Sequence, residues 1–283
     1  MLPSLIDSHS HLQFSAFDKD RQEVIGRMRE KNISTIIIGG NLEESQEAIA
    51  LAEKNDFFVS IGLHPIHVEE INDNSQGIVP AEDFDVDKFS QLLKNPRVVG
   101  IGECGLDYFH VQDESKKKEQ KEIFQKQIQL AKDFKKPLIL HIRDKNSFAA
   151  YQDVLDILEK NNYQGEGAGV VHFFSADWAM AKKFLDLGFY LSFTGVITFT
   201  HQYDEVIKNT PIEKLLVETD SPYVAPEPFR GKRNEPIFVE YVAKRLAELK
   251  DISLEEVVEI TTKNCTELFG LDYTKVQSKY YEV

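Results

Sequence analysis

The sequence predicts a single (β/α)8 barrel, and three observations support this. Eight short apolar segments alternate with amphipathic, helix-like segments, which is typical of a parallel sheet covered by helices. Eight is the number of parallel strands that closes into a barrel, and 283 residues are enough for one such domain. The Gly-rich fingerprint that usually follows the first strand of a doubly wound sheet is missing, so that open-sheet fold is the less favoured alternative.

The predicted strands are short apolar runs, at 5–6, 35–38, 57–61, 98–102, 137–140, 169–171, 189–192 and 215–217. The predicted helices lie between them, at 21–31, 43–54, 115–135, 147–161, 177–187 and 238–249. A final amphipathic helix is expected over 253–269, where Ser253 and Glu256 have the spacing of a capping box. We therefore expect one barrel domain over 1–270 and a surface tail over 271–283.

The chain is acidic, with 33 basic and 47 acidic residues and a net charge of −14. This charge argues against a protein that coats nucleic acid through a broad basic surface. It still allows a local site that holds a phosphodiester through metal ions. Part of the acidity lies in the segment 68–87, which interrupts the regular alternation and is predicted to be a loop over one side of the barrel.

No signal peptide is recognisable in the first thirty residues, and no segment approaches the roughly 18 apolar residues that span a bilayer. The two cysteines, Cys104 and Cys265, lie in different segments and do not form a metal-binding pair. A soluble, cytoplasmic protein with no membrane partner is expected. A monomer is the expected state, although nothing in the sequence determines it.

Polar side chains of the kinds that bind metals follow five of the predicted strands. They are His9, His11, Glu103, His141, His172 and Asp220. In a barrel the carboxyl ends of the strands converge on one face, where catalytic groups lie. Side chains at i and i+2 of a strand face the same way, so His9 and His11 can both point into this mouth.

Each of these residues has an ordinary structural alternative. A single strand-end histidine is more often hydrogen-bonded than metal-bound, an aspartate can cap a turn, and a glutamate can begin a helix. Five independent placements at strand ends are hard to explain in that way. Imidazole and carboxylate ligands suit zinc, manganese and similar ions, and this number of ligands suits two ions about 3.5–4 Å apart, bridged by a carboxylate.

Several motifs in this order resemble the TatD family of metal-dependent deoxyribonucleases, from about residue 5 to residue 271. They are Asp7-Ser8-His9-Ser10-His11, Gly62-Leu63-His64-Pro65, Gly102-Glu103-Cys104-Gly105-Leu106-Asp107-Tyr108, His141-Ile142-Arg143-Asp144, His172-Phe173-Phe174-Ser175, Glu218-Thr219-Asp220-Ser221-Pro222-Tyr223, Arg230-Gly231-Lys232-Arg233-Asn234-Glu235-Pro236 and Asn264-Cys265-Thr266-Glu267-Leu268-Phe269. His-x-His alone is weak evidence, whereas the glutamate and aspartate motifs in this order are specific.

The resemblance implies two divalent metal ions, Zn²⁺, Mn²⁺ or Mg²⁺. One ion is held by His9, His11, Glu103 and Asp220, and the other by Glu103, His141 and His172. Glu103 is the bridge where the wider amidohydrolase superfamily often has a carbamylated lysine, so no such modification is required. Asp220 also orients or deprotonates the attacking water.

The implied substrate is DNA, cleaved as by a 3′–5′ exonuclease on single-stranded or damaged strands. The residues expected to bind it are His64, Arg143, Arg230 and Arg233. Phe173 and Phe174 are candidates for stacking a base, with at least one of them expected in the core. The alternative is a metal-dependent hydrolase of another substrate on the same barrel: an amide, a lactone, an ester or an aminoacyl-tRNA.

The sequence departs from the common family pattern in three places. Ile66 separates Pro65 from His67, Ala176 replaces a frequent glycine, and the acidic segment 68–87 is long. None of these changes removes an implied metal ligand. The first and third bear on substrate access and preference.

Overall fold

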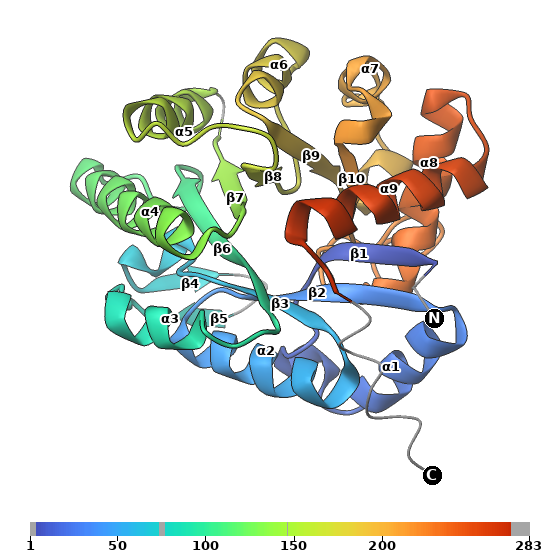
Figure 1. Cartoon of the computed structure of the whole chain (residues 1–283), viewed down its shortest axis with the longest axis horizontal. Helices are drawn as coiled ribbons and strands as arrows, with labels where there is room; N and C mark the ends of the chain where they lie inside the picture. Colours follow the sequence, from blue (N-terminus) through green and yellow to red (C-terminus); the bar gives the residue numbers. More distant parts are fainter. Residues whose placement is uncertain (1–3, 74–76, 146, 273–283) are drawn as a thin grey trace.

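The computed structural model describes residues 4–73, 77–145 and 147–272, and it confirms the barrel. Eight parallel strands form one sheet in the order β1-β2-β3-β6-β7-β8-β9-β10, with helices outside the ring (Figure 1). The strands are β1 (Leu5–Ser10), β2 (Ile33–Gly39), β3 (Phe58–Ile61), β6 (Val98–Asp107), β7 (Leu138–Arg143), β8 (Gly169–Val171), β9 (Phe189–Phe193) and β10 (Leu215–Val217). Every predicted strand is present, and the doubly wound alternative is wrong.

The helices of the described chain are α1 (Arg21–Glu30), α2 (Leu42–Asn55), α3 (Val86–Leu92), α4 (Glu114–Phe134), α5 (Ala149–Lys160), α6 (Trp178–Asp186), α7 (Asp204–Asn209), α8 (Val239–Lys250) and α9 (Leu254–Phe269). The predicted helices correspond to all of these except α3 and α7, which have only 7 and 6 residues and therefore show little periodicity. Across the described residues, no helix is both long enough and apolar enough to cross a membrane.

The ring closes between β10 and β1 through residues that follow β10. The backbone N–H of Asp220 donates to the carbonyl of His9 at 2.9 Å. The buried carboxylate of Asp7 accepts from the backbone N–H of Thr219 at 2.8 Å and from its hydroxyl at 2.6 Å. These contacts place Asp220 beside the end of β1, where the first two predicted ligands lie.

One end of the barrel is covered by α9, which lies across the ring in Figure 1. Its buried Leu268 and Phe269 pack in one cluster with strand residues such as Ile6 and Phe58. The predicted capping box is confirmed, since the hydroxyl of Ser253 accepts from the backbone N–H of the helix's third residue. Because α9 covers the amino ends of the strands, the carboxyl ends form the mouth.

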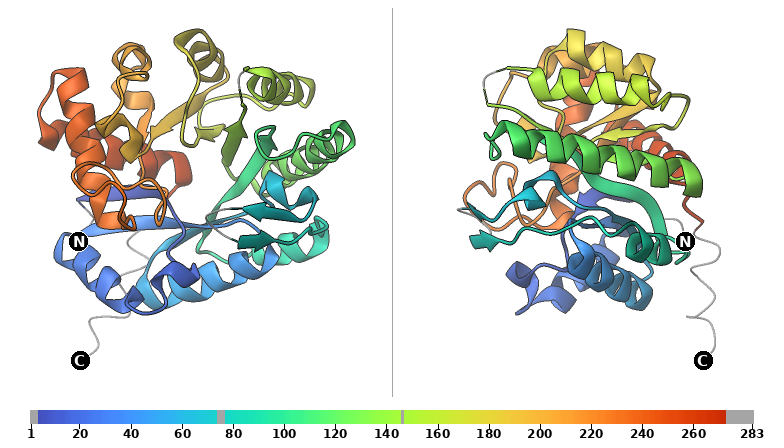
Figure 2. Two further views of the ribbon diagram at one scale, coloured as in Figure 1. Left: turned by 180° about the vertical axis from the view of Figure 1, so that it is seen from behind. Right: turned by 90° about the vertical axis from the view of Figure 1, so that its left-hand side faces the viewer.

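The acidic segment 68–87 differs from the plain loop that was predicted. It contains an antiparallel hairpin, β4 (Ile71–Asp73) and β5 (Gly77–Val79), which lies outside the ring of strands (Figure 2). His67 ties the segment to the barrel, since its Nδ1 lies 2.9 Å from the carbonyl of Pro80. The three-residue strands are too short for a clear alternating pattern. Most of the predicted tail, 273–283, lies outside the described residues.

Candidate metal centre

A bulge in β6 aims Glu103 into the barrel mouth. Residues 101–104 of β6 pair with residues 138–140 of β7, so β6 carries one extra residue there. Bulges of this kind redirect a side chain. Gly102 makes the bulge possible, because its φ is +139° and a Cβ at this position would lie 2.3 Å from the carbonyl oxygen of Ile139. This close approach explains the glycine directly before Glu103.

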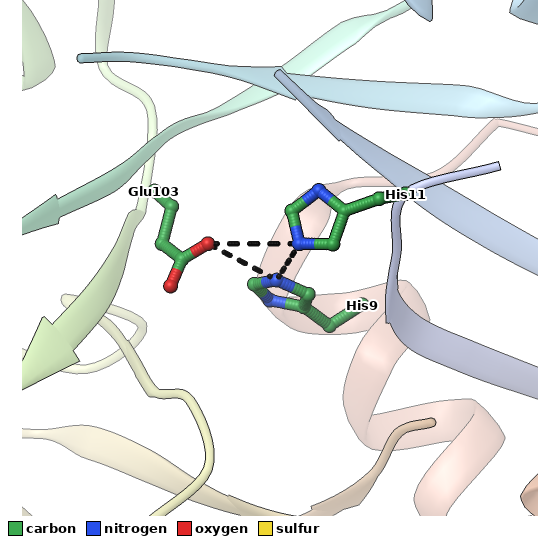
Figure 3. Close-up of side chains that lie close together, drawn as sticks. All are labelled: His9, His11 and Glu103. Carbon is green, nitrogen blue, oxygen red and sulfur yellow. Dashed lines mark hydrogen bonds and ion pairs between the residues drawn. The ribbon is translucent and has the colours of Figure 1, made fainter. Parts of the chain in front are cut away.

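The two carboxylate oxygens of Glu103 face two different sets of imidazoles. Oε2 lies 3.3 Å from His9 Nε2 and 3.8 Å from His11 Nε2. Oε1 lies 2.8 Å from His141 Nδ1 and 3.3 Å from His172 Nε2. Figure 3 shows the first set, with both rings directed at the carboxylate. Glu103 thus lies between two pairs of nitrogen ligands.

Asp220 completes the first set. Its Oδ1 lies 3.5 Å from His11 Nε2 and 3.7 Å from His9 Nε2, and these two nitrogens are 3.3 Å apart. His9, His11 and Glu103 are buried and their ligand atoms are close enough together to hold a metal ion. The structure therefore brings all six predicted ligands to one place.

Three of the four imidazoles contact an acceptor through the nitrogen that faces away from Glu103. The contacts are His11 Nδ1 to the carbonyl of Ile38 at 3.0 Å, His141 Nε2 to Asp107 Oδ2 at 3.0 Å, and His172 Nδ1 to Glu218 Oε1 at 2.9 Å. At His11 and His141 the acceptor holds a hydrogen on the outer nitrogen and leaves a lone pair on the inner one, whereas the contact of His172 with Glu218 is an ion pair without hydrogen-bond geometry. The donor set therefore fits a metal ion.

The charges of the cluster favour bound protons when metal is absent. Burial lowers the pKa of His141, but the hydrogen bonds that His141 donates to Asp107 and Glu103 outweigh it and raise this pKa to about 9. Burial is likewise outweighed at His172, where Glu218 and Glu103 raise the pKa to about 10. The surrounding histidines hold the pKa of Glu103 well below its usual range despite burial. A metal ion must displace the histidine protons to bind.

Sequence reasoning missed two buried carboxylates that position the ligands. Asp107 contacts His141, and its Oδ2 also lies 2.8 Å from His110 Nδ1. Glu218 contacts His172 and accepts a hydrogen bond from the backbone N–H of the next residue, Phe173, at 2.7 Å. Both lie in the quoted motifs, in the Glu103 and Asp220 segments. Each lies at the same strand end as a predicted ligand, and this position could have identified them from the sequence.

Replacing Asp107 with asparagine is expected to weaken metal binding about 10- to 100-fold, because His141 loses the acceptor that orients it. Isothermal titration of the metal-free protein with Zn²⁺ or Mn²⁺ measures the effect. Asp177→Asn is a matched control, since Asp177 caps α6 and asparagine caps equally well. Wild-type metal affinity in Asp107→Asn would show that Asp107 does not position His141.

The predicted substrate-binding residues fall into two groups. His64 lies at the cluster, with Nε2 3.5 Å from Glu103 Oε1, and Arg143 lines the same cavity. Arg230 and Arg233 are not among the lining residues. Arg230 stacks on Phe199. The two terminal guanidinium nitrogens of Arg233, Nη1 and Nη2, donate to a carboxylate at 2.7 and 2.6 Å. That carboxylate, Asp20, holds the cation in a structural ion pair.

His64 differs from the predicted ligand histidines in which ring nitrogen carries the hydrogen. Its Nδ1 accepts from the backbone N–H of Ile66 at 3.2 Å, so its hydrogen lies on Nε2, which faces the cluster. Burial and the neighbouring His141 lower its pKa to about 4, so the ring is neutral at pH 7. His64 therefore offers a neutral N–H donor at the metal site.

The cluster lies at the floor of a cavity of about 900 Å³. Two cations, Arg143 and Lys145, and several aromatic side chains line it, including Tyr223 and Phe173. Phe173 faces this space while Phe174 is fully buried, so one of the two rings lies in the core as expected. Ligand sites in proteins commonly have volumes of about 300–1,000 Å³, so this cavity has the size of a site for an organic substrate.

A protein-family model described as TatD related DNase matches residues 6–270. The chain belongs to the TatD family. A similar relative is the uncharacterized metal-dependent hydrolase YabD of Bacillus subtilis, 38% identical over 272 residues, which cover 95% of this chain and 100% of the relative. YcfH of Escherichia coli K12, with the same description, is 35% identical over 97% of this chain and 98% of its own.

Solved structures agree with this assignment. The crystal structure of YJJV, a TatD homolog from Escherichia coli k12, superposes with a TM-score of 0.83 at 27% identity, covering 96% of this chain and 100% of that one. A TatD family hydrolase from Entamoeba histolytica has a TM-score of 0.79 at 23% identity over 95% and 99% of the two chains, which shows the shared fold. This TatD-family chain is thus a metal-dependent hydrolase, and its buried His and Glu groups are placed so that they can hold a metal ion.

Proposed function

We propose that the protein hydrolyses phosphodiester bonds of DNA with two divalent metal ions. The arrangement of Glu103 carries this proposal, because each of its carboxylate oxygens faces a separate pair of imidazole nitrogens. A carboxylate shared in this way is typical of sites that hold two ions about 3.5–4 Å apart and act on phosphate esters. Such ions would supply a nucleophile at neutral pH and neutralise charge on the phosphate.

The surrounding side chains have roles that follow from their charge and protonation. Burial raises the pKa of Asp220, but the hydrogen bond from His11 and the nearby His172 outweigh it, so this pKa lies below its usual range. An ionised Asp220 can accept the proton of the attacking water. His64 donates its Nε2 hydrogen to a phosphate oxygen, and Arg143 adds a positive charge from the cavity wall.

The proposed substrate and metal are supported by the side chains of the site and by the family to which the chain belongs. The matching family model is described as a DNase, and the two cavity cations suit a phosphate. The imidazole-rich ligand set favours zinc or manganese over magnesium, which prefers oxygen ligands. DNA thus reaches an acidic protein through a local site and not through a basic surface.

The proposal is tested with 5′- and 3′-labelled single-stranded oligonucleotides in a series of Zn²⁺, Mn²⁺ and Mg²⁺. Loss of nucleotides from the 3′ end, dependent on metal, is the expected result, and the same DNA as a duplex should react more slowly. A panel of carboxylic esters, lactones, a dihydropyrimidine and an aminoacyl-tRNA runs beside it. Turnover of a panel member without cleavage of DNA would replace the proposed substrate.

Asp220→Asn is expected to lower kcat about 10²- to 10⁴-fold, because the amide cannot accept the proton. KM for the oligonucleotide should change little, and the metal content of each sample is measured beside the rate. Asp85→Asn is the control, since Asp85 caps α3 away from the mouth and asparagine replaces it as a cap. A normal kcat in Asp220→Asn would exclude Asp220 as the proton acceptor.

A further inference from the structure

Two phenylalanines are exposed at the barrel mouth. Phe109 is 40% exposed and Phe148 is 42% exposed, which places them among the few large apolar side chains on the surface of the described residues. They follow β6 and β7, the strands that carry Glu103 and His141. Single exposed apolar side chains are common on protein surfaces, but these two rings lie beside a polar site and offer an apolar face to a ligand there.

Arg143 lies between these rings and the metal ligands. It is two residues beyond His141 on β7, so both side chains point into the mouth. Its guanidinium carbon lies 4.3 Å from the centre of the Phe109 ring. Among the described residues, no carboxylate pairs with Arg143. The Phe109 ring therefore lies against the guanidinium, while the side chain remains exposed in the cavity.

The neighbouring Asp144 does not neutralise Arg143, because its carboxylate is used within its own turn. Asp144 accepts from the backbone N–H of Lys145 at 2.7 Å, from the hydroxyl of Ser147 at 3.0 Å and from the backbone N–H of Ala150 at 3.0 Å. These bonds hold the turn that leads into α5. The turn in consequence carries Phe148 at a defined place on the cavity rim.

Phe148 is supported from behind and open in front. Its ring meets Tyr151 edge to face, with the ring centres 6.0 Å apart. Tyr151 is itself buried, and its hydroxyl is hydrogen-bonded to Ser175 at 3.0 Å. Phe148 also lines the cavity that holds the metal ligands. A rigid support behind an exposed ring is what a stacking platform needs, since little side-chain entropy is then lost on binding.

We propose that Arg143, backed by Phe109, and Phe148 form a subsite for a nucleobase next to the scissile phosphate. This inference rests on the proposed function. A nucleobase has two flat faces and stacks on both aromatic rings and guanidinium planes. With a net charge of −14, the protein gains little from general attraction to the DNA backbone, so stacking supplies much of the affinity. A base can enter only when it has left the double helix, which favours single strands and frayed ends.

The test compares a thymidine octamer with an octamer of the same length in which every sugar carries hydrogen in place of the base. Wild-type KM should be roughly 5- to 100-fold higher for the base-free octamer, in line with the known contribution of base stacking. Phe148→Leu should raise KM by a similar factor on the thymidine octamer and leave the base-free octamer unchanged. Phe148→Tyr keeps a ring and should restore the wild-type KM.

Two further variants separate stacking from charge and from general surface effects. Arg143→Lys keeps the positive charge but loses the plane, so it should weaken binding of the thymidine octamer more than of the base-free one. Val86→Ala changes another exposed apolar side chain, outside the cavity lining, and should behave as wild type.

The outcomes separate this inference from the proposed function. Equal KM of the wild-type protein for both octamers would overturn the subsite while leaving DNA hydrolysis standing. So would a Phe148→Leu defect of the same size on both octamers, since the ring would then serve the fold. Failure of the wild-type protein to cleave either octamer would overturn the proposed function and the subsite together.

Discussion

Replacing Glu103 with glutamine is expected to abolish metal-dependent hydrolysis, with a loss of at least about 10³-fold in kcat. The amide keeps the shape of the side chain but removes the negative charge that faces both pairs of histidines. Several kilocalories per mole of charge stabilisation at a metal site correspond to a rate change of this order. Bound metal, measured by elemental analysis, should fall together with the rate.

The matched control for this variant is Glu82→Gln. Glu82 accepts from the backbone N–H of Leu42 at 3.1 Å and does not line the cavity. Its replacement should leave metal content and rate unchanged. Circular dichroism in the near ultraviolet checks that both variants keep the native fold. Full metal content and a normal rate in Glu103→Gln would contradict the bridging arrangement.

Metal binding at pH 7 is expected to release about two protons. His141 and His172, with pKa values raised to about 9 and about 10, both hold protons at pH 7 in the metal-free protein. Each ring must lose one proton before its inner nitrogen can bind metal. Apparent affinity should therefore fall by up to about 100-fold between pH 7 and pH 6, roughly tenfold for each proton.

Calorimetric titration in buffers of different ionisation enthalpy counts the released protons directly. His201→Asn is the control, because this histidine is exposed and pairs with Asp204 and not with any residue of the cluster. Release of no protons at pH 7 would mean that the two rings are already neutral. That result would contradict the charge balance around Glu103.

The same raised pKa values make the stability of the metal-free protein depend on pH. Protonated His141 and His172 stabilise the fold most fully below their unfolded pKa of about 6.5. This contribution is lost as the pH rises through about 9 and then about 10. The free energy of unfolding of the metal-free protein should therefore decline over this alkaline range, and bound metal should remove most of the dependence.

That the six candidate metal ligands lie together could be predicted from the sequence, because a simple rule governs their positions. Parallel strands of a barrel end at the same face, so a polar residue directly after each apolar run must lie near the others. His141 after 137–140 and His172 after 169–171 are clear examples. The apolar runs themselves are easily recognised, because strands buried on both faces have few polar residues.

The contacts that orient each of these side chains could not be predicted in the same way. Which nitrogen of a histidine faces Glu103 depends on the acceptor behind the ring. Asp107 comes from β6, where a bulge alters the spacing, and Glu218 reaches His172 from a different strand end. A bulge shifts every later side chain by one position, and the sequence pattern does not reveal it beyond the glycines at its edge. The short helices α3 and α7 were missed for a related reason, since one or two turns carry too little periodicity.

The basic residues show the same division between local pattern and tertiary position. Arg143 could be placed at the mouth because it shares a strand face with His141. Arg230 and Arg233 looked equally suitable in sequence, yet one stacks on Phe199 and the other binds Asp20. Loop residues have no fixed direction, so only the folded chain determines which cation meets a carboxylate and which remains open to a substrate.

The sequence by itself determined the barrel, the helix that covers its amino end and the meeting of six His, Glu and Asp side chains at its mouth, because strand periodicity and strand-end convergence are properties of local pattern. The tertiary structure decided how the ligands are oriented, which carboxylates support them, and that two supported planes, Phe148 and the Arg143 guanidinium, remain open on the cavity wall. These features depend on contacts between segments far apart in the chain, such as Asp7 with Thr219 and Glu103 with His141. Such contacts exist only when the ring of strands has closed.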